Sequence, residues 1–287
     1  MKVGLTLAGG GLQGFSHIGA IKALEELGIN IEFVSGTSTG SLVAALYAMG
    51  YNAKEMETIL KKEYKQILKF KKRVLMKVII NYILHKDTRT EGIVDGKIVS
   101  DLVNKVAYEK GIKLITDIKS KKLVIATVDT ITMKECVFTS EKIEKKEDKT
   151  NYIEEINIGD AVRASMSFPA IFNTLDFNQY NFIDGGTIDN LPARFLKDMG
   201  ADKIISVSFD LNKYQKSLNL EGVITRALDI FSRSSVEEGR RISDISMEIY
   251  NKNTSLIDMD DFDKTIENGY NAIMNNKDKI LQIFTEK

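Results

Sequence analysis

The sequence predicts an α/β protein with a mainly parallel central sheet. Short apolar runs that suit buried strands alternate with amphipathic helical patterns along most of the chain. This alternation is typical of a parallel sheet covered by helices on both faces. Two glycine clusters, at residues 9–14 and 36–40, stand where a strand pattern gives way to a helical one. Such turns are the usual place for chemistry in α/β sheets.

Length and composition indicate a protein with a substantial core and no overall charge. The chain has 287 residues, of which 43% are hydrophobic and 28% charged, and it contains no repeat or linker-like segment. We therefore expect one domain over residues 1–287, with a core of about residues 1–210 and a mainly helical extension over 211–287. The 40 basic residues balance 40 acidic ones, so no attraction to nucleic acid is expected.

The sequence also indicates a cytoplasmic protein. The apolar run at residues 3–8 is too short for a signal peptide and leads directly into glycines. No apolar run approaches the ~18 residues that a membrane span requires. The single cysteine, Cys136, has no partner for an internal disulfide and is expected to be a buried, inert thiol.

The first fifty residues predict two strand–helix pairs. Residues 3–8 suit a strand buried on both faces, and residues 14–27 follow as a helix with one apolar face that Gly28 is placed to end. Residues 31–34 predict the second strand, and the apolar residues within 42–49 begin the second helix.

A basic and apolar stretch covers residues 61–84, after a predicted helix at 53–62. Eight basic residues and one acid, Glu63, lie between positions 61 and 77, among many large apolar side chains. Such a stretch can lie on an anionic membrane surface. The alternative, which we favour, is a surface helix that packs its apolar side on the sheet.

The alternation continues to the end of the chain. Helical patterns cover residues 95–110, 158–166, 191–199, 221–250 and 263–284, and strand patterns cover 122–128, 135–140, 176–183 and 203–209, with a possible edge strand at 255–258. The mixed-charge segment 141–151 is expected to be an exposed loop. The helix at 158–166 must end before Pro169, since the residue ahead of a proline resists the helical conformation.

The first glycine cluster allows two interpretations. Gly9, Gly11 and Gly14 match the dinucleotide-binding fingerprint, and Glu32 follows at about the distance of a ribose contact. However, Glu32 lies inside the second strand, not at its carboxyl end. Consecutive glycines also let several backbone N–H groups point one way at the start of a helix. Such a loop suits a phosphate or the oxyanion of an acyl-transfer intermediate.

The second glycine cluster fits a nucleophile elbow. Gly36-x-Ser38-x-Gly40 follows a predicted strand, and this sharp turn exposes a serine hydroxyl. A nucleophilic serine needs a base. The chain has only His17 and His85, so a triad in the order serine, acid, histidine is excluded.

A carboxylate within hydrogen-bonding reach can serve as the base instead. Asp184 is the best-placed candidate, because it ends a predicted strand and precedes Gly185 and Gly186, which permit a tight turn. The alternative is that Asp-Gly-Gly is only a turn, since these residues are common turn formers.

Together these motifs resemble the patatin-like phospholipase family. The resemblance consists of Gly-Gly-Gly-Leu-Gln-Gly at 9–14, Gly-Thr-Ser-Thr-Gly at 36–40, Ala-Ser-Met-Ser-Phe-Pro at 164–169 and Asp-Gly-Gly at 184–186. Their order and separations are those of the family, and the resemblance covers roughly residues 1–209. It implies a three-layer α/β/α fold, a lipid acyl ester substrate and no metal or other cofactor.

The resemblance also implies roles for individual residues. Ser38 would be the acylated nucleophile and Asp184 the proton acceptor, in a dyad without histidine. The oxyanion hole and substrate-binding loop would be formed by Gly9, Gly10, Gly11 and Gly14. The family usually carries Arg or Lys where this chain has Gln13, which argues against a phosphate-binding role at that position.

The sequence therefore predicts a lipid acyl hydrolase of the phospholipase A, lysophospholipase or carboxylesterase type. It would act on a lipid or fatty-acyl ester and would have no nucleic-acid partner, while membrane-surface contact through residues 61–84 stays open beside the favoured surface helix. Two alternatives of other classes stay open. One is a non-catalytic lipid- or partner-binding protein on the same fold, and the other is a dinucleotide-binding oxidoreductase.

Overall fold

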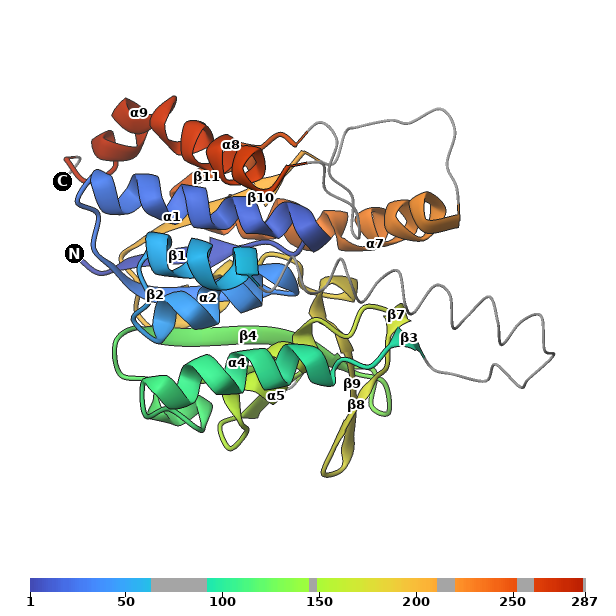
Figure 1. Ribbon diagram of the computed structural model, residues 1–287. Coiled ribbons are helices and arrows are strands. Elements are labelled where there is room, and N and C mark those ends of the chain that lie inside the picture. The colour runs from blue at the N-terminus through green and yellow to red at the C-terminus, as the bar shows by residue number, and fades with distance from the viewer. Residues whose placement is uncertain (63–91, 145–148, 211–219, 252–260, 286–287) are drawn as a thin grey trace.

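The structure, a computed structural model, describes residues 1–62, 92–144, 149–210, 220–251 and 261–285 (Figure 1). A nine-stranded sheet forms its centre, with the order β11-β10-β1-β2-β4-β5-β6, with β9 paired to β4 and β8 paired to β9. Its strands are β1 (Val3–Leu7), β2 (Ile31–Thr37), β4 (Lys122–Asp129), β5 (Lys134–Thr139), β6 (Thr150–Ile153), β8 (Leu175–Phe177), β9 (Tyr180–Asp184), β10 (Lys203–Phe209) and β11 (Ile245–Ile249). A separate pair joins β3 (Gly92–Val94) to β7 (Ala170–Phe172).

Helices cover both faces of this sheet (Figure 1). They are α1 (Ser16–Glu26), α2 (Thr39–Ala48), α4 (Lys97–Glu109), α5 (Ile158–Ser165), α6 (Ala193–Asp198), α7 (Leu220–Ile242), α8 (Phe262–Met274) and α9 (Lys277–Gln282), with short 3₁₀ turns η1 (Gly11–Phe15), η2 (Ile115–Asp117) and η3 (Gly185–Thr187). Residues 53–62 are also helical. No helix in the described ranges has the length and apolar character to cross a bilayer.

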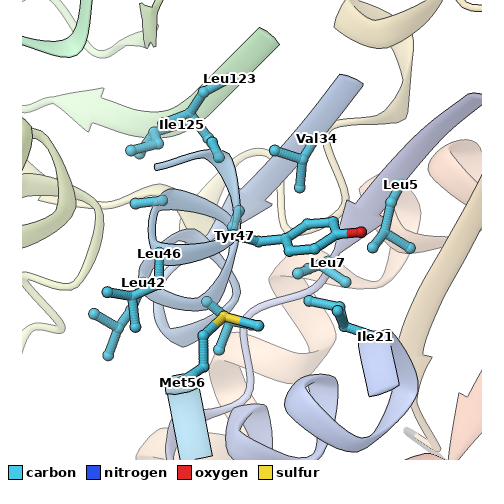
Figure 2. Packing of buried hydrophobic residues seen from close by; sticks show 14 of the residues in the cluster. Leu5, Leu7, Ile21, Val34, Leu42, Leu46, Tyr47, Met56, Leu123 and Ile125 are labelled. Atoms are coloured by element: carbon cyan, nitrogen blue, oxygen red, sulfur yellow. The ribbon is translucent and has the colours of Figure 1, made fainter. Parts of the chain in front are cut away.

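Successive side chains of a strand point to opposite faces of the sheet and pack against the helices on those two faces. In β2, Phe33 packs with Leu196 of α6, whereas its neighbour Val34 joins the core cluster beneath α1 and α2. The larger cluster is drawn in Figure 2, where Leu5, Leu7, Ile21, Val34, Leu42, Leu46, Tyr47, Met56, Leu123 and Ile125 are labelled. Neighbouring residues of one strand thus serve opposite faces, as expected for strands buried on both sides.

Strand directions confirm the predicted mainly parallel sheet. β1 pairs in parallel with both β2 and β10, and parallel pairing continues to β4 on one side and β11 on the other. β5 and β9 run antiparallel to β4. The α/β fold with three layers is therefore as predicted, and the carboxyl ends of β1, β2, β4, β10 and β11 meet at one edge of the sheet.

The C-terminal third departs from the prediction at residues 245–249. The sequence pattern predicts one helix over 221–250, but α7 ends at Ile242 and β11 follows. Asp244 stops the helix, because its carboxylate accepts the Ile204 N–H at 2.8 Å and its own N–H donates to the Ile204 carbonyl at 2.9 Å. Residues 263–284 likewise form two helices, α8 and α9, and not one.

Two smaller differences concern strands. The loop predicted at 141–151 gives way to β6 at Thr150, which pairs with the edge of β5. The strand predicted at 176–183 is a hairpin of β8 and β9, turned at Asn178 with a φ of 52°. The predicted edge strand at 255–258 lies outside the described residues, as does most of the basic stretch 61–84.

Cys136 is buried in β5, as predicted. Burial raises the pKa of its thiol to about 11, so the thiol stays protonated and unreactive at physiological pH.

Candidate active site

The predicted site residues meet at the carboxyl edge of the sheet. The glycine loop follows β1, Ser38 follows β2, and Asp184 ends β9, which places all three beside one pocket with a cavity volume of about 50 Å³. The pocket is lined by Gly9, Gly10, Gly11, Ser38, Phe168, Asp184, Gly186, Thr187, Asn190, Asp229 and Ser232. Four predicted glycines, Gly14, Gly36, Gly40 and Gly185, are not among its lining residues.

Ser38 has the backbone geometry of a nucleophile elbow. Its φ is 52° and its ψ is −128°, a region that a residue with a side chain occupies only under strain. The turn is fixed by α2, since the Ser38 carbonyl accepts the Ser41 N–H at 2.9 Å and the Ser41 hydroxyl at 2.6 Å. This conformation presents the Ser38 hydroxyl at the pocket.

The two elbow glycines have no space for a side chain. A Cβ on Gly36 would lie 2.5 Å from the Gly40 carbonyl, and a Cβ on Gly40 would lie 2.3 Å from the Leu7 carbonyl oxygen. Gly185 is similar, because a Cβ there would lie 2.3 Å from the Ala126 carbonyl oxygen. Gly36 therefore lets β2 lie directly against the start of α2, while Gly40 and Gly185 let the elbow and the base turn lie against β1 and β4.

We predict that Gly40→Ala lowers the unfolding free energy by about 3 kcal/mol or more, because the new methyl overlaps backbone that cannot move cheaply. Gly200→Ala is the control, since Gly200 has a φ of 94° but open space around its Cβ position, and only the backbone strain of about 1–2 kcal/mol applies. Urea denaturation of both variants measures the difference. Equal destabilisation would contradict the steric account.

Asp184 is buried beside Ser38, with 3% of its surface exposed. Its Oδ1 accepts the Gly186 N–H at 2.8 Å, whereas its buried Oδ2 has no hydrogen-bond partner in the described part of the chain. Burial raises the pKa of the carboxyl to about 6. The nearby Ser38 hydroxyl, which is not within hydrogen-bonding geometry of Oδ2, and the Gly186 N–H oppose this shift. Above this pH the group is a carboxylate with one oxygen available to accept a proton.

The last residue of α5 and the segment after it hold Ser38 and Asp184 in place. The Ser165 hydroxyl accepts the Ser38 N–H at 2.9 Å and donates to the Ala126 carbonyl at 2.6 Å. Two residues later, the Ser167 carbonyl accepts the Asp184 N–H at 3.0 Å. The sequence motif at 164–169 therefore fixes the backbone of both residues, a role that its composition alone does not indicate.

Asn190 is a site residue that the sequence interpretation missed. Its side-chain oxygen accepts the Gly9 N–H at 3.0 Å, and its side-chain nitrogen donates to the Gly9 carbonyl at 3.3 Å. The Ser235 hydroxyl of α7 accepts the Asn190 N–H at 3.1 Å. The available signal was an asparagine six residues after Asp184, in the same turn, but the contact to Gly9 spans 181 positions of the chain.

We expect Asn190→Ala to lower the rate of ester hydrolysis by roughly 10–100-fold, because a loop displaced by about 1 Å loses alignment with the reacting group. Asn276→Ala is the matched control, since in the described part of the chain that side chain donates to the Ala272 carbonyl in the last turn of α8 and does not line the pocket. Initial rates with a short-chain ester compare the two. A wild-type rate for Asn190→Ala would contradict the loop-positioning role.

His17 is placed to support the glycine loop, not to act as a base. It is fully buried in α1, its Nε2 donates to the Ala8 carbonyl at 2.8 Å, and its ring lies 5.0 Å from that of Phe209. Burial lowers its pKa to about 4, so it stays neutral at physiological pH. His17 does not line the pocket, and His85 lies outside the described residues.

A buried ionic cluster lies behind the turn that follows Asp184. Arg194 contacts both Glu135 of β5 and Asp189, and the Thr37 hydroxyl donates to the Asp189 carbonyl at 2.8 Å. Burial and the neighbouring Glu135 raise the pKa of Asp189 to about 7, although Arg194 opposes the shift. The cluster ties the turn to β2 and β5, and none of its charged residues lines the pocket.

The geometry suits acyl transfer better than dinucleotide binding. The Gly9 N–H that a pyrophosphate would need is already bonded to Asn190, and Gly10 packs so closely that a Cβ would lie 2.5 Å from the Phe209 ring. Among the lining residues that the structure describes there is no Lys or Arg. Within the described ranges, no group of three or more His, Cys, Asp or Glu side chains is arranged to hold a metal ion.

Comparisons with known proteins agree with this geometry. The family model described as "Patatin-like phospholipase" matches residues 5–197. "Lysophospholipase NTE1" of Meyerozyma guilliermondii is 32% identical over 208 residues, which covers 71% of this chain and 12% of the relative. "Lysophospholipase NTE1" of Yarrowia lipolytica is 31% identical over 208 residues, with the same 71% and 12%. The chain thus spans about an eighth of the length of these relatives.

Solved structures share the fold at low sequence identity. VipD from Legionella pneumophila has a TM-score of 0.50 at 14% identity, covering 97% of this chain and 66% of that one. ExoU in its complex with SpcU from Pseudomonas aeruginosa has a TM-score of 0.52 at 19% identity, covering 98% of this chain and 52% of that one.

Proposed function

The chain belongs to the patatin-like phospholipase family, and on that premise we propose that it hydrolyses lipid acyl esters through Ser38 and Asp184. The observation that carries the proposal is the pocket itself, where a strained serine, a buried carboxylate and a glycine loop meet. One carboxylate oxygen of Asp184 has no hydrogen-bond partner among the described residues, and the pKa of the carboxyl is about 6. Both properties suit a general base near neutral pH.

The proposed reaction has two halves. Asp184 takes the hydroxyl proton of Ser38 while the Ser38 oxygen attacks the ester carbonyl. The alcohol product then leaves with that proton. Backbone N–H groups of Gly10 and Gly11 stabilise the tetrahedral oxyanion, each contributing ~3–4 kcal/mol. Asp184 then removes a proton from water, which attacks the acyl-serine, releases the fatty acid and restores Ser38.

Among substrates, we propose a lysophospholipid first, because the curated relatives bear the name lysophospholipase. Diacyl phospholipids and neutral acyl esters are the alternatives. Gln13 stands where the family usually has a basic residue, and none of the described residues that line the pocket is basic. We therefore propose that the pocket holds the ester group and that a phosphate head group stays outside it.

Fatty-acid release tests this proposal. Lysophosphatidylcholine, diacylphosphatidylcholine and monoacylglycerol are incubated separately with wild type and with Ser38→Ala, and the free fatty acid is measured by mass spectrometry. We expect release by wild type only, fastest from lysophosphatidylcholine. Absence of release from all three substrates would favour the non-catalytic lipid-binding alternative, against which the presence of both Ser38 and Asp184 argues.

A cytoplasmic location and membrane contact through residues 61–84 stay part of the proposal, and most of that stretch lies outside the described residues. If it contacts anionic lipid, hydrolysis of vesicles should rise with anionic lipid content at low salt, since such attraction is screened by salt.

A further inference from the structure

The pocket is too small to hold a whole lipid. Its cavity volume is about 50 Å³, whereas sites that enclose a drug-sized ligand measure about 300–1,000 Å³. The space suits an ester group and little more. Most of a lipid substrate must therefore lie beyond the pocket, against whatever surface surrounds its mouth.

That surface carries large apolar side chains from separate parts of the chain. They are Ile131 and Met133 in the turn after β4, Ile188 after η3, and Val223, Ile230 and Phe231 on α7. We call these six residues the apolar rim. Met133 is 80% exposed, and Ile131, Ile230 and Phe231 are each more than 60% exposed.

The topology places the rim on the side of the pocket. β4 runs parallel to β2, so the turn with Ile131 and Met133 stands at the same edge of the sheet as Ser38. In Figure 1, α7 extends past this edge of the sheet, on the side where β3 and β7 lie. Ile188 follows the η3 turn that begins directly after Asp184.

Around residues 229–232, α7 is oriented opposite to an ordinary surface helix. Asp229 and Ser232 line the pocket, while Ile230 and Phe231 between them are 62% and 65% exposed. A surface helix normally turns its apolar side to the core and its polar side to solvent. Here the polar side faces the pocket and the apolar side faces outward, which indicates an outer partner that is itself apolar.

We propose that the apolar rim is a docking surface for a lipid bilayer, into which it inserts so that a lipid's ester group enters the pocket. The inference rests on the proposed function. Because the rim adjoins a pocket that is proposed to take acyl esters, we expect it to contact lipid and not another protein. Two basic groups of the described part of α7 are paired, Arg226 with Asp229 and Arg233 with Glu237. Insertion is therefore driven by apolar contact and suits zwitterionic lipid as well as anionic lipid.

Binding to vesicles of ether-linked phosphatidylcholine tests the inference without hydrolysis, because this lipid has no acyl ester. Co-sedimentation in 0.5 M salt suppresses any contribution of residues 61–84. We expect Ile230→Ser/Phe231→Ser and, separately, Ile131→Ser/Met133→Ser to weaken partitioning by about tenfold or more, since each pair loses two insertable side chains.

The matched control is Tyr108→Ser/Leu281→Ser. These side chains are 56% and 40% exposed, but they lie at the end of α4 and on α9, away from the rim (Figure 1). The control should bind within twofold of wild type. Two independent rim variants, each checked by circular dichroism, keep the result interpretable if one fails to fold.

Wild-type binding by both rim variants would overturn the inference. So would loss of self-association in the rim variants at unchanged vesicle binding, which would make a second copy of the chain the occupant. Neither result touches the proposed hydrolysis, which is judged separately by fatty-acid release. Conversely, the rim variants could lose vesicle binding while wild type binds vesicles but releases no fatty acid. That result would support the docking role of the rim and contradict only the catalytic proposal.

Discussion

Ser38→Ala is expected to reduce fatty-acid release on the order of a thousandfold or more, because no other hydroxyl in the described pocket combines an elbow with an adjacent buried carboxylate. The loss should appear in kcat, since the covalent step itself is removed. Rates of enzyme-dependent release at saturating substrate measure it.

Ser100→Ala is the control for the first variant. Ser100 is a buried helical serine whose hydroxyl donates to the Lys97 carbonyl within α4, so its replacement should leave kcat within a few-fold of wild type. Equal activity of Ser38→Ala and wild type would remove Ser38 from the mechanism.

Asp184→Asn is expected to lower kcat/KM by a similar factor, because the amide cannot accept the Ser38 proton. For wild type, kcat/KM should rise with pH through about 6, the pKa of Asp184, and then level off as the carboxylate becomes fully ionised. His17, with a pKa of about 4, is already neutral over this range. A profile that stays flat between pH 5 and 7 would contradict Asp184 as the base.

The same substitution should increase stability at neutral pH. Burial raises the pKa of Asp184 to about 6 from an ordinary value of 3.8, so the folded protein holds this proton more tightly than the unfolded chain. Its contribution to stability is present below pH ~4 and is lost as pH rises to 6. Asparagine avoids that loss, so Asp184→Asn should unfold with a free energy roughly 1–3 kcal/mol higher at pH 7.5.

Urea unfolding at pH 4 and pH 7.5 distinguishes this pH-dependent gain in stability from an effect of the substitution that does not depend on pH. The difference between Asp184→Asn and wild type should grow with pH, whereas Asp278→Asn, an exposed change in α9, should show no such dependence. A variant less stable than wild type at pH 7.5 would indicate that the carboxylate has stabilising partners that outweigh its burial.

Local patterns were sufficient to predict the first two strand–helix pairs. The apolar run of β1, the glycines after it and the face of α1 are adjacent in sequence, and each restricts the backbone on its own. The same holds for the elbow at Ser38, where close contacts require glycine on both sides. Gly14 fits this pattern too, since a Cβ there would lie 2.5 Å from the Thr39 side chain.

Long-range contacts account for what the sequence interpretation missed. Asn190 bonds to Gly9 across 181 positions, and Ser165 bonds to Ser38 across 127, so neither pairing leaves a local pattern. β11 was missed because its five residues follow a long helix and gain their stability by pairing with β10. Since β11 extends the central sheet and α8 packs on α1, we propose that residues 1–287 form a single domain.

The most direct measurement of the central claim is the intact mass of the protein after reaction with a fluorophosphonate probe, which phosphonylates an activated serine. Wild type, Ser38→Ala and Asp184→Asn are compared, with detergent present as a lipid substitute. We predict one adduct on wild type and none on either variant. No adduct on wild type, or an unchanged adduct on Ser38→Ala, would contradict the proposed dyad and make the glycine loop a binding site for another ligand.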